Sequence, residues 1–167
     1  MEARVDSAPG GGSTKVLVVD DHDGFRTGLA AILAEEGLAV DAASSGEAAL
    51  ARAAQIKPDV VLMDADLPGM SGAEAARRLL RVIGSVRVVM IGFHDDGRLE
   101  ALRCGAHGYL SKAAPLEDVL VSIRAAAHAD RESAGPASAA PSAHRDASSA
   151  HEATVDRRFV EGEAIAA

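Results

Sequence analysis

Apolar residues are distributed along the chain with two alternating periodicities. Five short runs are mostly apolar, and such runs are typical of strands buried on both faces of a parallel sheet. Between them, apolar residues recur every three to four positions, which is the spacing of amphipathic helices. The predicted strands cover residues 15–20, 38–43, 59–64, 86–91 and 107–110, and the predicted helices cover residues 24–36, 44–55, 71–82, 95–104 and those from 115 onward. The pattern predicts five consecutive strand–helix units, and therefore an α/β fold on a parallel sheet.

Several predicted helix ends carry residues that favour capping. Ser44 is followed by Glu47, and Ser71 is followed by Glu74. A serine with a glutamate three positions later has the spacing of a capping box, which satisfies the first backbone N–H groups of a helix. Gly105 follows the predicted fourth helix, and glycine favours the left-handed backbone that ends many helices. These residues predict where three of the helices begin or end.

The composition of the chain changes near both ends. Residues 1–13 are small and polar and are predicted to be a flexible leader. Residues 14–130 carry the strand–helix units and are predicted to form one domain. Residues 131–167 are rich in Ala and Ser, so they are predicted to be a disordered tail without an output domain. The larger apolar side chains within 155–165 are compatible with either a frayed end or a short docking helix.

The composition also narrows the class of protein. Of the 167 residues, 48% are hydrophobic and 25% are charged, as in ordinary soluble globular proteins. The net charge of −8 and the 2% aromatic content argue against an exposed nucleic-acid surface. Cys104 is the single cysteine, so no intrachain disulfide can form and a reducing compartment fits. The chain has no apolar run of membrane-spanning length and no signal-peptide core, so a cytoplasmic location without membrane contact is predicted.

Charged residues lie at the carboxyl ends of three predicted strands. Asp20 and Asp21 end the first strand, Asp64 ends the third, and Lys112 follows the fifth. In parallel α/β sheets these ends meet at one edge, outside which ligands bind. Acids that lie close together raise each other's proton affinity unless a cation compensates them, and oxygen ligands suit Mg²⁺. The sequence therefore predicts a divalent-metal site at this edge, and the adjacent His22 is interpreted as an ordinary loop residue.

Three sequence runs carry a resemblance to a known family. The runs are VLVVDDHDGFRTGLAAIL, PDVVLMDADLPGMSG and GAHGYLSKAAPLEDVLVSIRAA. Together they resemble the receiver domain of two-component response regulators over residues 14–128. The DDH after the first predicted strand and the GYLSKAAP run at the fifth look most like the subfamily that usually carries a helix-turn-helix output domain. The resemblance implies a flavodoxin-like, doubly wound (βα)5 fold, with a five-stranded parallel sheet in strand order 2-1-3-4-5.

The resemblance also implies a reaction and a partner. Asp64 matches the phosphoacceptor, whose carboxylate attacks the phosphorus of a phosphohistidine on a sensor histidine kinase or a phosphotransfer protein. Lys112 matches the lysine that pairs with the phosphoryl oxygens, and Tyr109 matches the aromatic residue whose rotamer reports the state of the domain. Such a domain is a signalling phosphoacceptor and not an enzyme in the usual sense, because it catalyses at most its own phosphorylation and slow dephosphorylation.

The metal ligands implied by the resemblance come from the same edge of the sheet. Asp21 matches the direct ligand, and Asp20 matches the acid that holds the metal through water. Asp64 and the backbone carbonyl of Asp66 complete the protein contacts. The implied cofactor is Mg²⁺ or Mn²⁺, since hard cations of this kind take oxygen ligands, and no other cofactor is expected.

The sequence departs from the family pattern at the end of the fourth strand. The family has Thr or Ser there, and its hydroxyl binds the phosphoryl group, whereas this chain has Gly92. The next position is usually small or a methionine, but here it is Phe93, which is expected to crowd the site. The backbone amides of both residues remain available as donors. We therefore expect Asp64 to accept a phosphoryl group while its coupling to Tyr109 is weakened.

Two classes of function remain open. The first is a stand-alone receiver that is phosphorylated on Asp64 and signals through protein contacts, including a homodimer formed by the fourth helix, the fifth strand and the fifth helix. The second is a receiver-like docking or dimerisation module that works without phosphorylation, which Gly92 favours. A haloacid-dehalogenase-like phosphatase is a weaker alternative, because Phe25 stands where that family has Thr. A dinucleotide-binding fold is excluded, because no glycine-rich loop follows the first strand.

Overall fold

The computed structural model describes residues 13–94 and 97–133. The predicted leader, most of the predicted tail with the apolar residues of 155–165, and the first residues of the predicted fourth helix lie outside these ranges. None of the helices within the described ranges is long and apolar enough to cross a membrane.

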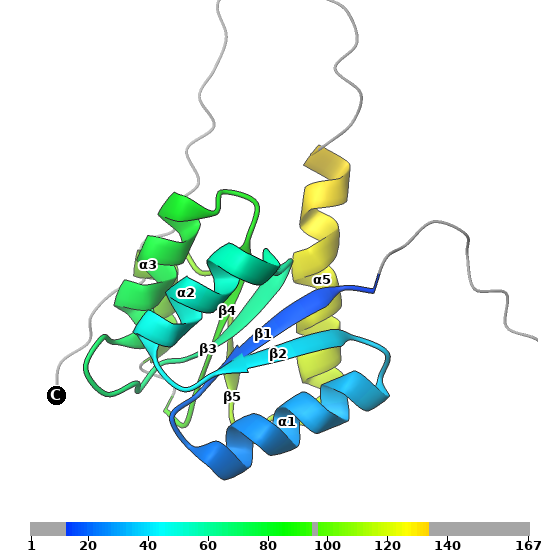
Figure 1. Ribbon diagram of the computed structural model, residues 1–167, viewed down its shortest axis with the longest axis horizontal. Coiled ribbons are helices and arrows are strands. Elements are labelled where there is room, and N and C mark those ends of the chain that lie inside the picture. The colour runs from blue at the N-terminus through cyan, green and yellow to red at the C-terminus, as the bar shows by residue number, and fades with distance from the viewer. Residues whose placement is uncertain (1–12, 95–96, 134–167) are drawn as a thin grey trace, which may run out of the picture. The chain divides into compact units, whose positions relative to one another are not determined.

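A five-stranded sheet forms the centre of the described part of the chain (Figure 1). Its strand order is β2-β1-β3-β4-β5, and every pairing is parallel. The strands are β1 (Lys15–Val19), β2 (Ala39–Ala43), β3 (Val60–Asp64), β4 (Arg87–Gly92) and β5 (Gly108–Ser111). This arrangement confirms the predicted flavodoxin-like fold with strand order 2-1-3-4-5. The order of the strands changes direction at β1 and β3, and folds of this kind bind ligands at the carboxyl ends of such strands.

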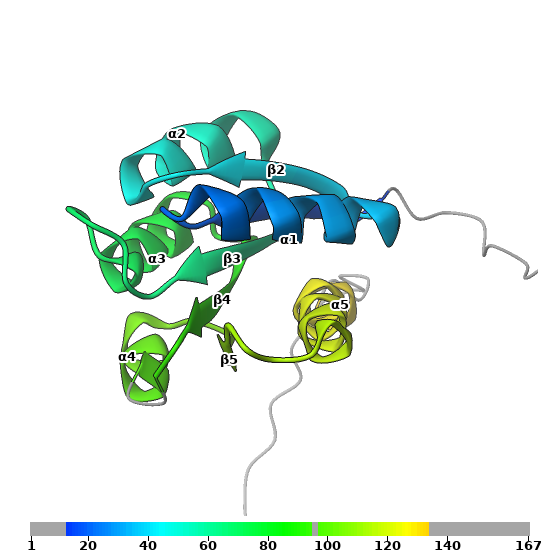
Figure 2. The ribbon, with the colours of Figure 1, turned by 90° about the horizontal axis from the view of Figure 1, so that it is seen from below.

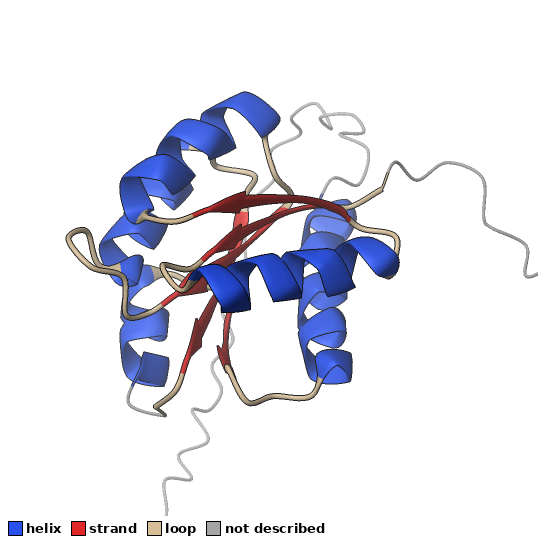
Figure 3. Cartoon of the chain, turned by 60° about the horizontal axis from the view of Figure 1, so that its bottom comes forward, coloured by secondary structure: helices blue, strands red, loops and turns tan. Residues whose placement is uncertain are grey.

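Five helices cover the two faces of the sheet, as Figures 2 and 3 show. The helices are α1 (Asp23–Glu35), α2 (Gly46–Ile56), α3 (Gly72–Val82), α4 (Gly97–Cys104) and α5 (Leu116–Ser133). Leu33 of α1 and Ile123 of α5 belong to one buried cluster. Ala53 of α2, Leu79 of α3 and Ala101 of α4 belong to the other. The sheet is therefore covered by α1 and α5 on one face and by the remaining helices on the opposite face.

The central strand β3 shows why the predicted strands are apolar throughout. All of its residues are buried. Val60 and Leu62 pack in the cluster beneath α1 and α5, whereas Val61 and Met63 pack in the cluster on the other face. Successive side chains of a strand point to opposite faces, so a strand that is covered on both sides needs apolar residues at every position. The exception is the last residue, Asp64, which is a buried acid at the carboxyl end.

Two of the predicted helix ends are confirmed. Ser71 is the N-cap of α3, and its side chain accepts a hydrogen bond from the backbone N–H of Glu74 (3.3 Å). Gly105 follows α4 with a φ of +85°, a left-handed conformation that glycine adopts without steric cost. At the other end of the domain, α5 continues to Ser133, past the predicted boundary at residue 130.

The predicted start of α2 is wrong by one residue. Ser45, and not Ser44, is the N-cap, and its side chain accepts a hydrogen bond from the backbone N–H of Ala48 (3.2 Å). Ser45 has the extended backbone of an N-cap residue, with φ of −156° and ψ of 165°. Two adjacent serines offer two registers for the cap, and the chain adopts the one that buries the alanine face of α2 against the sheet. In this register Glu47 lies in the first turn, where the helix dipole favours an acid.

Candidate functional site

The carboxyl ends of β1 and β3 bring two acids together. The two strands pair directly, Asp20 follows β1, and Asp64 is the last residue of β3. Both residues are almost fully buried, with relative exposures of 0% and 1%. Burial of a carboxylate is costly unless hydrogen bonds or a cation compensate the charge. The partners of these two acids therefore decide whether the site is stable.

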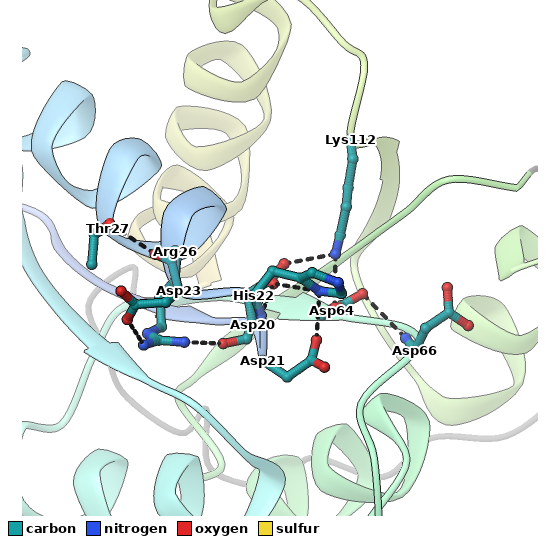
Figure 4. Close-up of polar contacts among 9 residues, drawn as sticks. All are labelled: Asp20, Asp21, His22, Asp23, Arg26, Thr27, Asp64, Asp66 and Lys112. Carbon is teal, nitrogen blue, oxygen red and sulfur yellow. Dashed lines mark hydrogen bonds and ion pairs between the residues drawn. The ribbon is translucent and has the colours of Figure 1, made fainter.

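Lys112 supplies a compensating charge. Its Nζ lies 2.7 Å from Asp20 Oδ2 and 2.8 Å from Asp64 Oδ2 (Figure 4). The side chain of Lys112 is only 3% exposed. Its backbone N–H donates to the carbonyl of Gly92 at the end of β4 (2.8 Å), which fixes the point where the lysine leaves the sheet. One ammonium group therefore bridges the two buried carboxylates.

Backbone groups bind the second oxygen of each carboxylate. The N–H of His22 donates to Asp20 Oδ1 (2.8 Å), and the N–H of Asp66 donates to Asp64 Oδ1 (3.1 Å) (Figure 4). The Arg26 guanidinium adds a bond from Nη1 to the backbone carbonyl of Asp20 (2.7 Å). Hydrogen bonds to an ionised acceptor are stronger than neutral ones, so the bonds from the His22 and Asp66 N–H groups orient the two carboxylates.

The pKa values at the site reflect burial and neighbouring charge. Burial raises the pKa of Asp64 above its ordinary value, the Asp20 charge adds to this effect, and Lys112 and the Asp66 N–H oppose it only in part. Burial alone would lower the pKa of Lys112, but the hydrogen bonds and charges of Asp20 and Asp64 outweigh burial and raise that pKa. The lysine is therefore charged at neutral pH, and the raised pKa of Asp64 means that its carboxylate favours further positive charge.

Four side chains at this edge are placed to hold a metal ion. Asp20, Asp21, His22 and Asp64 each offer one ligand atom, and these atoms lie within 4.8 Å of one another. The side chain of Asp21 is 31% exposed, so solvent reaches the cluster from this side. Apart from its ion pair with Lys112, Asp20 Oδ2 has no hydrogen-bond partner within the described residues. Carboxylate oxygens with remaining bonding capacity fit a hard cation such as Mg²⁺.

His22 and Asp66 contact the acidic cluster in ways that the sequence did not specify. His22, interpreted as an ordinary loop residue, is the N-cap of α1, and its Nδ1 lies 2.9 Å from Asp21 Oδ1. Asp66 is exposed and contacts Asp64 through its backbone N–H. The predicted role of the Asp66 carbonyl as a metal ligand stays a prediction. The available signal for His22 was its position directly after the acid pair, at the start of a helix.

Two aromatic rings lie beside the Lys112 ammonium, and sequence reasoning missed this contact. Nζ lies 5.1 Å from the centroid of the Phe25 ring and 5.0 Å from that of the Phe93 ring. Phe25 is in the first turn of α1, and Phe93 directly follows β4. The expectation that Phe93 crowds the site identified its position but not its partner. The signal available in the sequence was an aromatic residue close to each of two strand ends that converge on Lys112.

Tyr109 fills the space beside Gly92. A Cβ atom at position 92 would lie 2.5 Å from the Tyr109 hydroxyl oxygen, and one at Gly97 would lie 2.7 Å from its Cε2. The hydroxyl donates a hydrogen bond to the backbone carbonyl of His94. The ring therefore packs in a notch between two glycines, where a side chain at position 92 would collide with it.

Known proteins share both the sequence pattern and the fold. The pattern of the response regulator receiver domain matches residues 16–124. The response regulator GacA of Pseudomonas aeruginosa is 46% identical over 114 residues, which are 66% of this chain and 53% of GacA. The receiver domain of the putative response regulator NarL from Mycobacterium tuberculosis is 33% identical, with a TM-score of 0.64 over 69% of this chain and 96% of that domain. A CheY-like receiver domain protein from Methanospirillum hungatei shares the fold at 22% identity, with a TM-score of 0.69 over 73% of this chain and 99% of that chain.

These matches decide the family but not the whole protein's activity. The chain spans about half the length of GacA, so the expectations that it lacks an output domain and contacts no nucleic acid stay predictions. The relatives GacA of Pseudomonas aeruginosa and UvrY of Escherichia coli are both response regulators, as the sequence resemblance implied. The match over residues 16–124 includes all of β1 except Lys15, the other four strands, and the acids and lysine of the site. The chain belongs to the response regulator receiver domain family.

Proposed function

We propose that this chain accepts a phosphoryl group on Asp64 from a sensor histidine kinase or a phosphotransfer protein, in a Mg²⁺-dependent reaction in the cytoplasm, and passes the signal on through protein contacts. The observation that carries the proposal is the environment of the Asp64 carboxylate. It is buried at the end of β3, 2.8 Å from the Lys112 ammonium, and beside the acid pair Asp20 and Asp21. With a divalent cation bound by these acids, the cation and the Lys112 ammonium would together supply the positive charge that an incoming phosphoryl group needs.

Phosphoryl transfer needs positioning and charge neutralisation more than covalent help. An oxygen of Asp64 attacks the phosphorus, an O–P bond forms, and the P–N bond to the donor histidine breaks with its electron pair left on the imidazole nitrogen. The Asp66 N–H holds one carboxylate oxygen and so orients the nucleophile. Lys112 already lies against Asp64, where its ammonium can pair with the phosphoryl oxygens as charge develops.

The residues present fit a divalent cation. Asp20, Asp21 and Asp64 would hold Mg²⁺ or Mn²⁺, and the backbone carbonyl of Asp66 is the proposed fourth protein contact. When bound, the ion neutralises the charge of the acids and of the phosphoryl oxygens. In this proposal the chain is a signalling phosphoacceptor, which catalyses only its own phosphorylation and slow dephosphorylation.

Replacing Asp64 with Asn is expected to abolish phosphorylation, because the amide is a poor nucleophile. The protein is incubated with Mg²⁺ and a small phosphodonor, and its intact mass is then measured. The wild type should gain one PO₃ group, and Asp64→Asn should gain none. Asp118→Asn is the matched control, because it makes the same change at an exposed position in the first turn of α5. Absence of the adduct from the wild type would contradict the proposal.

Gly92 gives this site an atypical connection to Tyr109. No hydroxyl is available at position 92 to bind the phosphoryl group, and the Tyr109 ring already occupies the adjacent space. A phosphoryl group on Asp64 can therefore meet only backbone groups at this strand end, and the N–H of Gly92 lies in the ladder between β4 and β5. We propose that phosphorylation moves Tyr109 less than it does in receivers with Thr or Ser at this position.

Gly92→Thr is expected to displace the Tyr109 ring and to restore its response to phosphorylation. The displacement follows because a Cβ at this position would lie 2.5 Å from the Tyr109 hydroxyl oxygen. Tyr109 is the only tyrosine in a chain without tryptophan, so its ring NMR signals and its fluorescence can be followed without interference. Gly92→Ala is the control, because it displaces the ring without supplying a hydroxyl. An equal phosphorylation response in Gly92→Thr and Gly92→Ala would contradict the proposed role of the hydroxyl.

A second candidate function is a docking or dimerisation module that works without phosphorylation. The packing of Tyr109 against Gly92 favours it, because the ring already lies in the notch without a phosphoryl group. Leu99 and Leu102 on α4 and Val121 on α5 are exposed and would serve a homodimer through α4, β5 and α5. An unmodified wild-type mass after incubation with the phosphodonor, together with a stable dimer in solution, would favour this second function.

A further inference from the structure

The Lys112 ammonium is surrounded by two kinds of partner. Asp20 and Asp64 bind it through charge at 2.7 and 2.8 Å, and the rings of Phe25 and Phe93 lie about equally far from it, at 5.1 and 5.0 Å to their centroids. Both ring distances are within the range at which a cation is attracted to the face of an aromatic ring. With carboxylates and rings together, little room is left for water, which agrees with the 3% exposure of this side chain.

The two rings have different surroundings. Phe25 is partly buried on α1, where it lines an apolar pocket together with Leu29 and Val119. Phe93 is 64% exposed and has no comparable packing on the core. Its contact with Lys112 is therefore the main interaction that the structure gives this ring. A substitution of Phe93 is expected to alter the environment of the lysine without disturbing the fold.

We propose that Phe25 and Phe93 form an aromatic clamp that holds the Lys112 ammonium on Asp64 and keeps water away from it, and that Phe93 thereby prolongs the lifetime of the phosphorylated state. This inference rests on the proposed function, because it concerns the aspartyl phosphate of Asp64. Phe93 acts as a positioning residue in this proposal, since it works through Lys112. The clamp matters more in this chain than it would in a receiver with Thr or Ser at position 92, because Gly92 supplies no hydroxyl that would bind the phosphoryl group.

Loss of the phosphoryl group occurs by hydrolysis. A water oxygen attacks the phosphorus, the O–P bond to Asp64 breaks with its electron pair left on the carboxylate, and a proton of the water is released to solvent or to the phosphate product. A lysine that stays paired with the phosphoryl oxygens and an apolar ring above it both limit the approach of water. Removing the ring loosens the lysine and opens this approach, so hydrolysis becomes faster.

The first measurement is the decay of the phosphorylated protein. Wild type, Phe93→Ala and Phe93→Leu are phosphorylated with acetyl phosphate and Mg²⁺, the donor is removed, and the loss of the PO₃ adduct is followed by mass. Phe93→Ala should decay about two to five times faster, as expected from the loss of one exposed cation–ring contact. Phe93→Leu keeps apolar cover without the aromatic face and should lie between the two. Val82→Ala, at another exposed apolar position at the end of α3, should decay like the wild type.

The second measurement needs no phosphoryl group. The exchange of the Lys112 ammonium protons with water is followed by NMR, and it should be several-fold faster in Phe93→Ala than in the wild type or Val82→Ala. Unchanged exchange would overturn the clamp. Faster exchange with an unchanged decay rate would overturn its effect on lifetime. If the wild type accepts no phosphoryl group at all, the proposed function fails and the lifetime inference fails with it, while the exchange measurement still tests the contact between Phe93 and Lys112.

Discussion

Replacing Gly72 with Ala is expected to lower the free energy of unfolding by on the order of 3 kcal/mol, the upper end of what overpacking usually costs. Gly72 is the first residue of α3 and is buried. A Cβ atom there would lie 1.9 Å from the backbone carbonyl oxygen of Asp64 and 2.9 Å from its carbonyl carbon. Neither atom belongs to a flexible side chain, so the start of α3 or the end of β3 would have to move. Urea unfolding monitored by circular dichroism measures the loss.

Gly28→Ala is the matched control and should have the opposite sign. Gly28 lies inside α1, is exposed, and would bring its new Cβ within 4 Å of no other atom. Alanine is favoured over glycine in a helix interior by roughly 0.5–1 kcal/mol, so this substitution should stabilise the protein by about that amount. A Gly72→Ala variant as stable as the wild type would show that α3 is not packed against Asp64 as closely as the structure has it.

The close approach at Gly72 also ties the proposed phosphoacceptor to the fold. The carbonyl of Asp64 lies against the start of α3, and its carboxylate lies against Lys112 after β5. Any shift of β3 that accommodates a larger residue at position 72 would therefore change the distance between Asp64 and Lys112. We expect a Gly72→Ala protein that still folds to be phosphorylated more slowly than the wild type.

The strand–helix pattern was sufficient to predict the elements and the parallel sheet because both faces of the sheet are covered. Val60 to Met63 alternate between two buried clusters, so the whole run had to be apolar and was easy to identify. The strand order came from the family resemblance, since no local pattern specifies which strands pair. The sequence could not predict a helix end for which two adjacent residues were chemically equivalent candidates. The cap of α2 is an example, because Ser44 and Ser45 have the same chemistry and only the packing of the helix selects Ser45.

The charged part of the site could be predicted because strand ends converge in a parallel sheet. Asp20, Asp64 and Lys112 are far apart in the sequence, yet each follows or ends a strand of the same sheet. The aromatic part could not be predicted in the same way. Whether Phe93 faces Lys112 or solvent depends on the path of a loop, and hydrophobic periodicity carries no information about that path. The packing of Tyr109 against Gly92 is likewise a result of tertiary structure.

Lys112→Met is expected to destabilise the protein by about 3 kcal/mol in the absence of Mg²⁺, because removing one partner of a buried ion pair leaves uncompensated charge behind. The side chains of Lys112, Asp20 and Asp64 are only 3%, 0% and 1% exposed. Solvent therefore cannot replace the lost ammonium without opening the site. Methionine keeps most of the apolar stem and its packing. Urea unfolding with and without Mg²⁺ measures the effect, and added Mg²⁺ should stabilise the variant more than the wild type, because the uncompensated acids bind the cation more tightly.

A double-mutant comparison separates this charge effect from the loss of packing. In an Asp64→Asn background one of the two buried charges is already absent, so Lys112→Met should cost clearly less than it does in the wild type. Asp20 retains its backbone hydrogen bond from His22 in both backgrounds, so it contributes equally to each arm of the comparison. An equal loss in the two backgrounds would mean that Lys112 stabilises the domain through its stem and not through its charge. In that case the site would not be held ready for a phosphoryl group by the ammonium, and the electrostatic basis of the proposed function would be contradicted along with the prediction.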